Sequence, residues 1–233
     1  MEKYIRTLTI QFDALLHPKE VTQFRGAVID SLKEKNILFH NHEESGSQRY
    51  SYPLIQYKRL HGKAAIVCVN DGINAIHSLF TGQDFRYRIG GREVAMLIEH
   101  VKSEECQINF TEEQIEYRLY NWLPLNSQNY KEYQAMDGII DRIHKLEEIL
   151  TSNILSMMKG KGIDIYIDEH IDISIKDIIQ QRLVIYKGVK RMAFDVVFKT
   201  KLQLPSNIGL GKSASVGFGV LTRNETKTNK HYE

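Results

Sequence analysis

Four glycines within eleven residues constrain the fold of this chain more than any other feature. The segment from Gly209 to Gly219 reads Gly-Leu-Gly, then five residues that include Lys212, then Gly-Phe-Gly. Glycine weakens helices and strands, and it lets backbone N–H groups come close to a ligand at unusual φ/ψ angles. The segment is therefore expected to form a loop, and a phosphate-rich partner is the first candidate ligand.

A nucleotide-binding P-loop is one alternative for this segment. Gly211, Lys212 and Ser213 match the end of that motif, but Ser206 holds the position of its first glycine. Residues 216–221 are typical of a strand broken by glycines, whereas a P-loop continues into a helix whose N-terminus faces the phosphate. A glycine-rich hairpin without a ligand is the other alternative. The favoured interpretation is a loop that lies along a polynucleotide backbone.

The eleven-residue pattern resembles the C-terminal glycine-rich loop of the CRISPR-associated repeat-processing endoribonucleases, the Cas-six family of the RAMP (repeat-associated mysterious protein) superfamily. Every glycine, both apolar residues between them and the lysine of the spacer match that pattern. Residues 52–72 and 122–133 are similar to the two halves of the same family. With the basic residues that cluster around the loop, the candidate RNA-binding residues are Gly209, Gly211, Lys212, Ser213, Gly217, Gly219, Lys190 and Arg191.

Composition is that of an ordinary globular protein, and it leaves both one large domain and two smaller ones open. The 233 residues are 42% hydrophobic and 26% charged. A net charge of +2 is weak evidence for a polyanionic partner, so an RNA-binding surface has to come from local clustering. Cys68 and Cys106 are too few for a disulfide framework and are expected to be free thiols. The N-terminus has no apolar signal core and no run approaches 18 apolar residues, so a cytoplasmic location is expected.

Hydrophobic periodicity predicts two cycles of strands and helices. In the first cycle, strands are expected at 4–12, 52–58, 64–69 and 94–110, with helices at 19–35 and 73–80. This β-α-β-β-α-β order is the ferredoxin-like arrangement. A second cycle begins near Thr111, with a long helix at 126–158 and strands at 115–125, 163–167, 183–187 and 193–204.

The expected fold class is α+β, with tandem ferredoxin-like (RRM-like) domains. Residues 1–110 form the N-terminal domain with a candidate catalytic loop, and residues 111–233 form the C-terminal domain with the glycine-rich RNA-binding loop. No internal repeat of residues supports the pairing, which rests on the order of elements alone.

The resemblance implies cleavage of a CRISPR repeat transcript without metal or other cofactor, by attack of a 2′-hydroxyl on the adjacent phosphorus. That reaction needs a proton acceptor, a proton donor and a cation near the phosphorane, and histidine can serve either proton role. His40 and His42 lie in a polar segment after the first helix, where the family places its histidine. His42 is favoured, and which of the two acts is left open. Lys58 and Tyr52 are the candidate partners, with Lys58 expected on an exposed strand face.

Metal chemistry has little support in the sequence. No cysteine or further histidine follows His40 and His42 at a spacing suited to zinc, and the acidic residues at 164–172 alternate with isoleucines as on a half-exposed strand. Two rival functions stay open: an RNA-binding module of the same superfamily that does not cut, and an unrelated RRM-like protein. The expected partner is CRISPR repeat RNA, single-stranded or hairpin, with a CRISPR effector complex and a homodimer as further options and no membrane contact.

Overall fold

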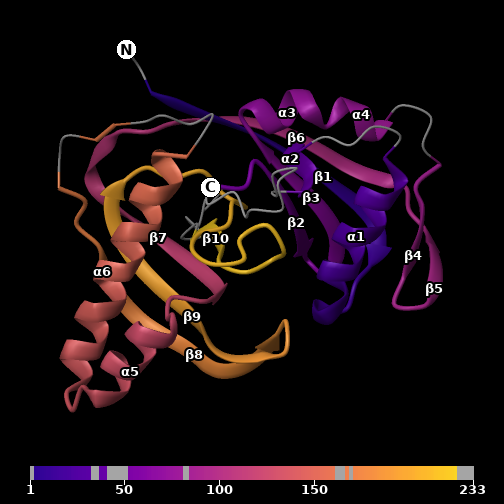
Figure 1. Cartoon of the computed structure of the whole chain (residues 1–233). Coiled ribbons are helices and arrows are strands. Elements are labelled where there is room, and N and C mark those ends of the chain that lie inside the picture. The colour runs from indigo at the N-terminus through magenta and orange to yellow at the C-terminus, as the bar shows by residue number, and fades with distance from the viewer. Residues whose placement is uncertain are drawn as a thin grey trace, which may run out of the picture.

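Two four-stranded antiparallel sheets form the two halves of the molecule (Figure 1). The computed structural model describes residues 3–32, 37–40, 52–80, 84–160, 166–167 and 170–224. The first sheet has the order β2-β3-β1-β6 and the second β10-β7-β9-β8. Their strands are β1 (Tyr4–Leu15), β2 (Ile55–Leu60), β3 (Lys63–Val69), β6 (Ile98–Gln107), β7 (Phe110–Trp122), β8 (Ser174–Tyr186), β9 (Val189–Leu202) and β10 (Val220–Arg223).

Both sheets have the ferredoxin-like topology, which confirms the predicted fold class. Counted along the chain within each sheet, the strands lie in the order fourth, first, third, second. The helices are η1 (Pro18–Glu20), α1 (Val21–Ser31), α2 (Ile37–His40), α3 (Asp71–Ala75), α4 (His77–Phe80), α5 (Ser127–Ala135) and α6 (Ile139–Met158). In the second half, residues 203–219 stand between β9 and β10, where the first half has α3 and α4. The glycine-rich segment therefore takes the place of the second helix of the repeat.

The helix expected at 19–35 begins with η1 and ends early, at Ser31. Val21, Phe24 and Val28 recur at three- and four-residue steps and pack on the inner face of the first sheet, beside Phe12 of β1. The Ser31 hydroxyl donates to the carbonyl of Val28 at 2.7 Å, and the next residue is extended. Such local side-chain bonds compete with continuation of a helix.

The long helix expected at 126–158 is two helices. Met136 is extended, and Gly138 lies at the N-cap of α6 with φ −88° and ψ 139°. An Asp-Gly pair, Asp137-Gly138, favours a turn over a helix. The Lys145 amine of α6 lies 2.9 Å from the carboxylate of Glu132 in α5, so the two helices form a hairpin beside the second sheet (Figure 1).

Other differences concern strands. Residues 86–95 form a separate hairpin, β4 (Arg86–Ile89) and β5 (Arg92–Ala95). No strand was expected at 86–89, and Val94 and Ala95 were placed at the start of the strand expected at 94–110. Strand β8 starts at Ser174, nine residues before the predicted strand at 183–187. Of the strand expected at 163–167, residues 163–165 lie outside the described part of the chain, and residues 166–167 are not in a strand.

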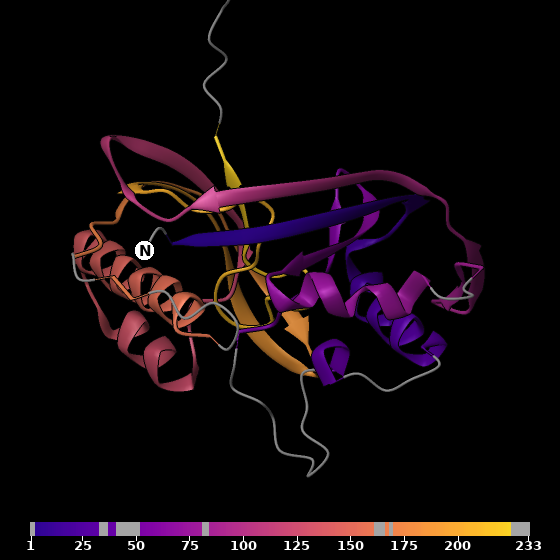
Figure 2. The same ribbon diagram turned by 90° about the horizontal axis from the view of Figure 1, so that it is seen from above.

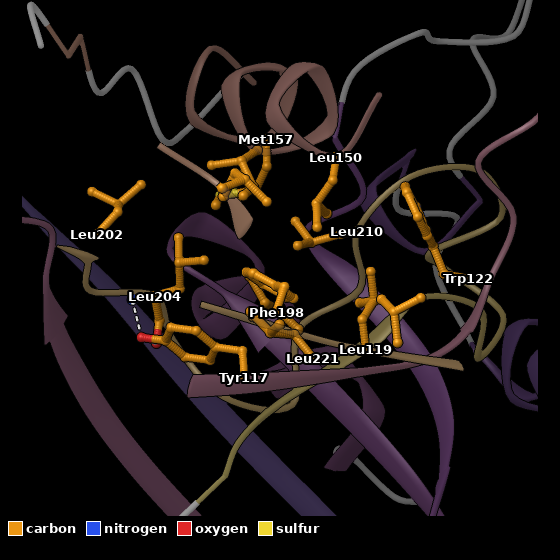
Figure 3. Packing of buried hydrophobic residues seen from close by; sticks show 14 of the residues in the cluster. Tyr117, Leu119, Trp122, Leu150, Met157, Phe198, Leu202, Leu204, Leu210 and Leu221 are labelled. Atoms are coloured by element: carbon orange, nitrogen blue, oxygen red, sulfur yellow. Dashed lines mark hydrogen bonds between the residues drawn. The ribbon is translucent and has the colours of Figure 1, made fainter. Parts of the chain in front are cut away.

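Helix α6 and the inner face of the second sheet form the larger core (Figure 3). Leu150 and Met157 of α6 face Tyr117 of β7 and Phe198 of β9, whose rings stack with centroids 5.6 Å apart. Leu210 of the glycine-rich segment enters the same core beside Leu150. In Figure 2 the helices of both halves lie on one side of the molecule and β1 and β6 on the other. Among the described residues, no helix is both long and apolar enough to cross a membrane.

Candidate functional site

The glycine-rich loop, residues 209–219, is closely packed on the protein. Gly219 has φ +63°, and a Cβ atom there would collide with the carbonyl oxygen of Leu210. Gly211 has φ +81°, and a Cβ atom there would lie 2.6 Å from Asn153 Oδ1 and 2.9 Å from Trp122 Nε1. These glycines are therefore required by close packing within the protein. The glycines were expected to let backbone N–H groups approach a ligand, and the structure gives Gly211 and Gly219 a packing role as well, with only part of the loop facing outward.

The loop also joins the two halves of the molecule. The N–H group of Tyr57 in β2 donates to the carbonyl of Ser215 at 2.8 Å, and Tyr57 forms a parallel bridge with Val216. Val216 is buried in the core of the first half, whereas Leu210 is buried in the core of the second. In Figure 1 the glycine-rich segment correspondingly lies between the two sheets, beside β10, the edge strand of the second sheet.

The outward part of the loop is the tripeptide Gly211-Lys212-Ser213. Its N–H groups make no hydrogen bond to any described residue, and Lys212 is exposed. Gly211 and Ser213 have φ angles of +81° and +59°, whereas that of Lys212 is not positive. Alternation of this kind turns successive N–H groups toward one side and makes anion-binding concavities. This tripeptide can therefore receive a phosphate oxygen.

A second cation stands beside the Lys212 amine. Partial burial, and then the nearby Arg191 guanidinium, lower the pKa of Lys212. Neither side chain forms an ion pair with a described residue, and the buried Nε of Arg191 has no hydrogen-bond partner there. Two like charges held together without a carboxylate repel each other, and a bound anion would relieve that repulsion. These two side chains, together with the Gly211-Lys212-Ser213 tripeptide, form what we call the Lys212–Arg191 corner, which is therefore suited to a phosphate group.

Lys190 is not part of this corner. It is the neighbour of Arg191 in β9, and it pairs with Ile185 of β8 while Arg191 pairs with Val184. Successive side chains of a strand point to opposite faces. The structure therefore brings Arg191 and Lys212 together and directs Lys190 to the other face of the hairpin.

The candidate catalytic histidines can be placed only in part. His42 lies outside the described residues. His40 is the last residue of α2, and the structure describes its backbone but not its side chain. No group of three or more His, Cys, Asp or Glu side chains that could hold a metal ion occurs among the described residues. Which histidine acts stays a prediction.

Lys58 differs from expectation, because it is fully buried instead of lying on an exposed strand face. It pairs with Ala65 of β3, and its Nζ has no hydrogen-bond partner among the described residues. Burial lowers the pKa of its amine to about 7. The reason is tertiary: Val220 of β10 and Tyr120 of β7 pack over this face of the first sheet, against Ala65.

Tyr52 is half-buried and its hydroxyl is shielded from solvent, although it lies just after the histidine-bearing segment. Burial raises the pKa of its hydroxyl, and the Gln56 side chain and the Gly209 backbone oppose that rise. The hydroxyl oxygen lies near both groups without a well-formed hydrogen bond to either. Tyr52 thus belongs to the packing around the glycine-rich loop and Lys58 to the face of the first sheet that β7 and β10 cover, and their catalytic roles stay predictions.

Sequence reasoning missed Gln56. Its side-chain amide is fully buried, donates from Nε2 to the carbonyl of Pro53 at 2.9 Å, and accepts at Oε1 from the N–H group of Gly209 at 2.8 Å. The available signal was a glutamine in the apolar run Leu54-Ile55-Gln56-Tyr57, because a buried polar side chain requires partners.

Comparisons with known proteins agree with the fold and the loop. The family models of the Cas6b N-terminal domain and the Cas6b C-terminal domain match residues 3–107 and 109–224. An uncharacterized protein of Methanocaldococcus jannaschii is 34% identical over 126 residues, which are 54% of this chain and 82% of that protein.

Two solved structures are similar over 95% of this chain and the whole of theirs. One is a crystal structure of Cas6b, with a TM-score of 0.86 and 24% identity. The other is described as CRISPR RNA processing endoribonuclease Cas6b, with a TM-score of 0.74 and 23% identity. Because the two family models together span both halves, including the glycine-rich loop, the chain belongs to the Cas6b family.

Proposed function

We propose that this protein is a metal-independent endoribonuclease that cleaves CRISPR repeat precursor RNA. The proposal is supported by family membership and by the description of a protein of the same fold as a CRISPR RNA processing endoribonuclease. The single observation that carries it in this chain is that Lys212, whose pKa is lowered by partial burial and by the Arg191 guanidinium, belongs to a loop tripeptide whose N–H groups make no hydrogen bond to a described residue. Uncompensated positive charge next to unbonded N–H donors is suited to a polyanion backbone.

In the proposed reaction, the 2′-hydroxyl of one nucleotide attacks the adjacent phosphorus. One imidazole, of His42 or His40, accepts the 2′ proton or donates a proton to the departing 5′ oxygen, and the other imidazole or a water molecule takes the remaining role, so that the proton lost by O2′ is matched by the one that O5′ gains. The new bond joins O2′ to phosphorus and the P–O5′ bond breaks, which leaves a 2′,3′-cyclic phosphate and a 5′-hydroxyl. No oxidant, reductant or metal is needed for this balance of atoms and protons.

In the same proposal the glycine-rich loop holds the RNA. The N–H groups of Lys212 and Ser213 donate to a phosphate oxygen, while Lys212 and Arg191 supply charge. Residues 1–110 then form the N-terminal domain with the catalytic segment, and residues 111–233 the C-terminal domain with the RNA-binding loop. A contact of Lys58 with the phosphorane has less support, because its amine is shielded from solvent.

The alternative is a non-catalytic RNA-binding module of the RAMP type, which grips the repeat or the mature guide RNA. The burial of Lys58 favours it, because that lysine was the expected cation of the reaction centre. The Lys212–Arg191 corner serves binding equally well with or without cleavage. A CRISPR effector complex or a homodimer would be compatible with either function.

The deciding experiment is incubation of the purified protein with repeat RNA in excess EDTA. Cleavage that leaves a 2′,3′-cyclic phosphate supports the enzyme, and binding without cleavage supports the module. The double variant His40→Ala/His42→Ala should abolish cutting and keep RNA affinity, whereas Lys212→Ala/Arg191→Ala should weaken binding. Undiminished cutting by the histidine double variant would remove both imidazoles from the mechanism.

A further inference from the structure

Two neighbouring residues of β2 hold the glycine-rich loop at two points. The side chain of Gln56 accepts from the N–H group of Gly209 at 2.8 Å, and the backbone N–H group of Tyr57 donates to the carbonyl of Ser215 at 2.8 Å. Lys212 lies midway between these two contacts. The stretch that presents the exposed amine is therefore fastened to the first sheet at both of its ends.

The Gln56 amide is fixed by its surroundings. It is fully buried, and its Nε2 donates to the carbonyl of Pro53 at 2.9 Å. That bond sets which end of the amide faces the loop, so the oxygen is the atom presented to Gly209. Because the second fastening is a backbone group of Tyr57, the Gln56 side chain is the one contact of the two that a substitution can remove.

We propose that Gln56 is a positioning residue that sets where the Lys212 loop stands relative to the first sheet, and that it influences RNA binding through that loop. This inference rests on the proposed RNA-binding function. Without the amide, the carbonyl of Pro53 loses its partner and the buried N–H group of Gly209 keeps only the poorly aligned Tyr52 hydroxyl nearby, and buried polar groups without good partners are costly. The loop then shifts to recover hydrogen bonds, and the Lys212–Arg191 corner loses its geometry.

Three variants separate positioning from general loss of stability. Gln56→Met keeps the shape of the side chain and removes both hydrogen bonds. Gln56→Glu keeps both while its carboxyl group is protonated, because the carbonyl oxygen can accept from Gly209 and the hydroxyl can donate to Pro53. Tyr117→Phe is the matched control: its hydroxyl accepts from the buried N–H group of Leu204 at 2.8 Å, five residues before the loop begins (Figure 3).

The first measurement is amide hydrogen exchange of peptides that cover residues 205–221, which requires no RNA. Gln56→Met should exchange about tenfold faster there than wild type, and Tyr117→Phe should not, at a temperature where all variants stay folded. The second is affinity for a repeat RNA with a 2′-deoxy nucleotide at the cleavage position. Gln56→Met should bind about tenfold more weakly, whereas Gln56→Glu should bind like wild type near pH 5 and progressively worse toward pH 8, because ionisation ends its bond to Pro53.

Each outcome decides the proposal. Unchanged exchange of the loop in Gln56→Met overturns the positioning role, and faster exchange with unchanged RNA affinity overturns its influence on binding. An equal loss of affinity in Tyr117→Phe, or a Gln56→Glu variant whose affinity relative to wild type does not vary with pH, reduces Gln56 to a purely structural residue. If wild-type protein binds no repeat RNA, the proposed function fails, and the exchange measurement still decides whether Gln56 fixes the loop.

Discussion

Replacement of Lys58 by methionine should stabilise the protein, although it removes a charged residue from the middle of a strand. The pKa of the Lys58 amine falls from 10.5 to about 7 because burial disfavours its charged form. A tenfold change in an equilibrium is worth about 1.4 kcal/mol, so keeping this amine buried costs about 5 kcal/mol at pH 7. Relaxation and water penetration soften such penalties in real proteins, and we expect Lys58→Met to raise the free energy of unfolding by about 2–4 kcal/mol at pH 7.

The pH dependence of this gain has a definite sign. Between the folded pKa of about 7 and the unfolded value of 10.5, the unfolded chain carries a proton on Lys58 that the folded chain lacks. Stability of the wild type therefore rises with pH across that window, and below pH 7 it carries the full penalty. The advantage of Lys58→Met should be largest at pH 6–7, fall to about half or less by pH 9, and vanish near pH 10.5.

Urea unfolding followed by circular dichroism, at pH 6, 7, 8 and 9, measures this difference directly. Lys63→Met is the matched control, because Lys63 is a partly exposed lysine of the adjacent strand whose amine lies 2.6 Å from a carboxylate oxygen of Glu99. It should change stability by about 1 kcal/mol or less. A Lys58→Met variant that is less stable than wild type, or whose advantage is the same at pH 6 and pH 9, would refute the reasoning. Loss of RNA cleavage in a stable Lys58→Met variant that still binds RNA would instead favour a catalytic lysine.

Three further predictions concern the loop. Gly219→Ala should lower the free energy of unfolding by several kcal/mol in chemical denaturation, because the new Cβ atom would collide with the carbonyl of Leu210. Gly91 also has a positive φ but has open space around it, so Gly91→Ala should cost only about 1–2 kcal/mol. Equal losses would show that backbone strain alone matters. Lys212→Ala should weaken RNA binding and reduce the steepness of log affinity against log salt concentration by about 0.7. The control is Lys201→Ala, because Lys201 is an exposed lysine at the other end of β9 from Arg191, and it should change both quantities less. A larger effect of Lys201→Ala would remove the loop from the RNA interface. Asn153→Leu should cost about 1–3 kcal/mol in the same unfolding assay, because the Trp122 indole N–H donates to Asn153 Oδ1 at 2.9 Å, and an unchanged midpoint would contradict that bond.

Periodicity in the sequence was sufficient to predict the ferredoxin-like order of elements, because each half alternates strand and helix signals that depend on near neighbours. The break at Asp137-Gly138 had a local signal too, but the apolar stripe on either side of it, with Tyr133 and Ile143, continues across the pair with helical spacing and favours a single helix. The β4–β5 hairpin was missed for a similar reason. Gly90 and Gly91, with φ +60° and +83°, are its two turn residues, and a Gly-Gly pair between two short strands is itself a hairpin signal.

Burial of Lys58 could not be predicted in this way. In the strand Ile55–Leu60, the polar residues Gln56 and Lys58 alternate with apolar ones, a pattern typical of a strand with one face in solvent. That face is covered by Val220 and Tyr120, which lie in the other half of the chain. Only the packing of one half on the other determines the environment of the amine, and such contacts leave no local pattern.

The glycine-rich loop combines two functions that a sequence pattern cannot separate. Leu210 anchors it in the core of the second half and Val216 in the core of the first, so the loop is part of what holds the two halves together. Its glycines allow that close approach, and a bulky residue at Gly219 would disturb the fold before any ligand is present. Lost RNA binding in glycine variants therefore cannot by itself identify an RNA interface. Lys212 and Arg191 can identify it, because neither side chain forms an ion pair with a described residue and both can be truncated without opening either core.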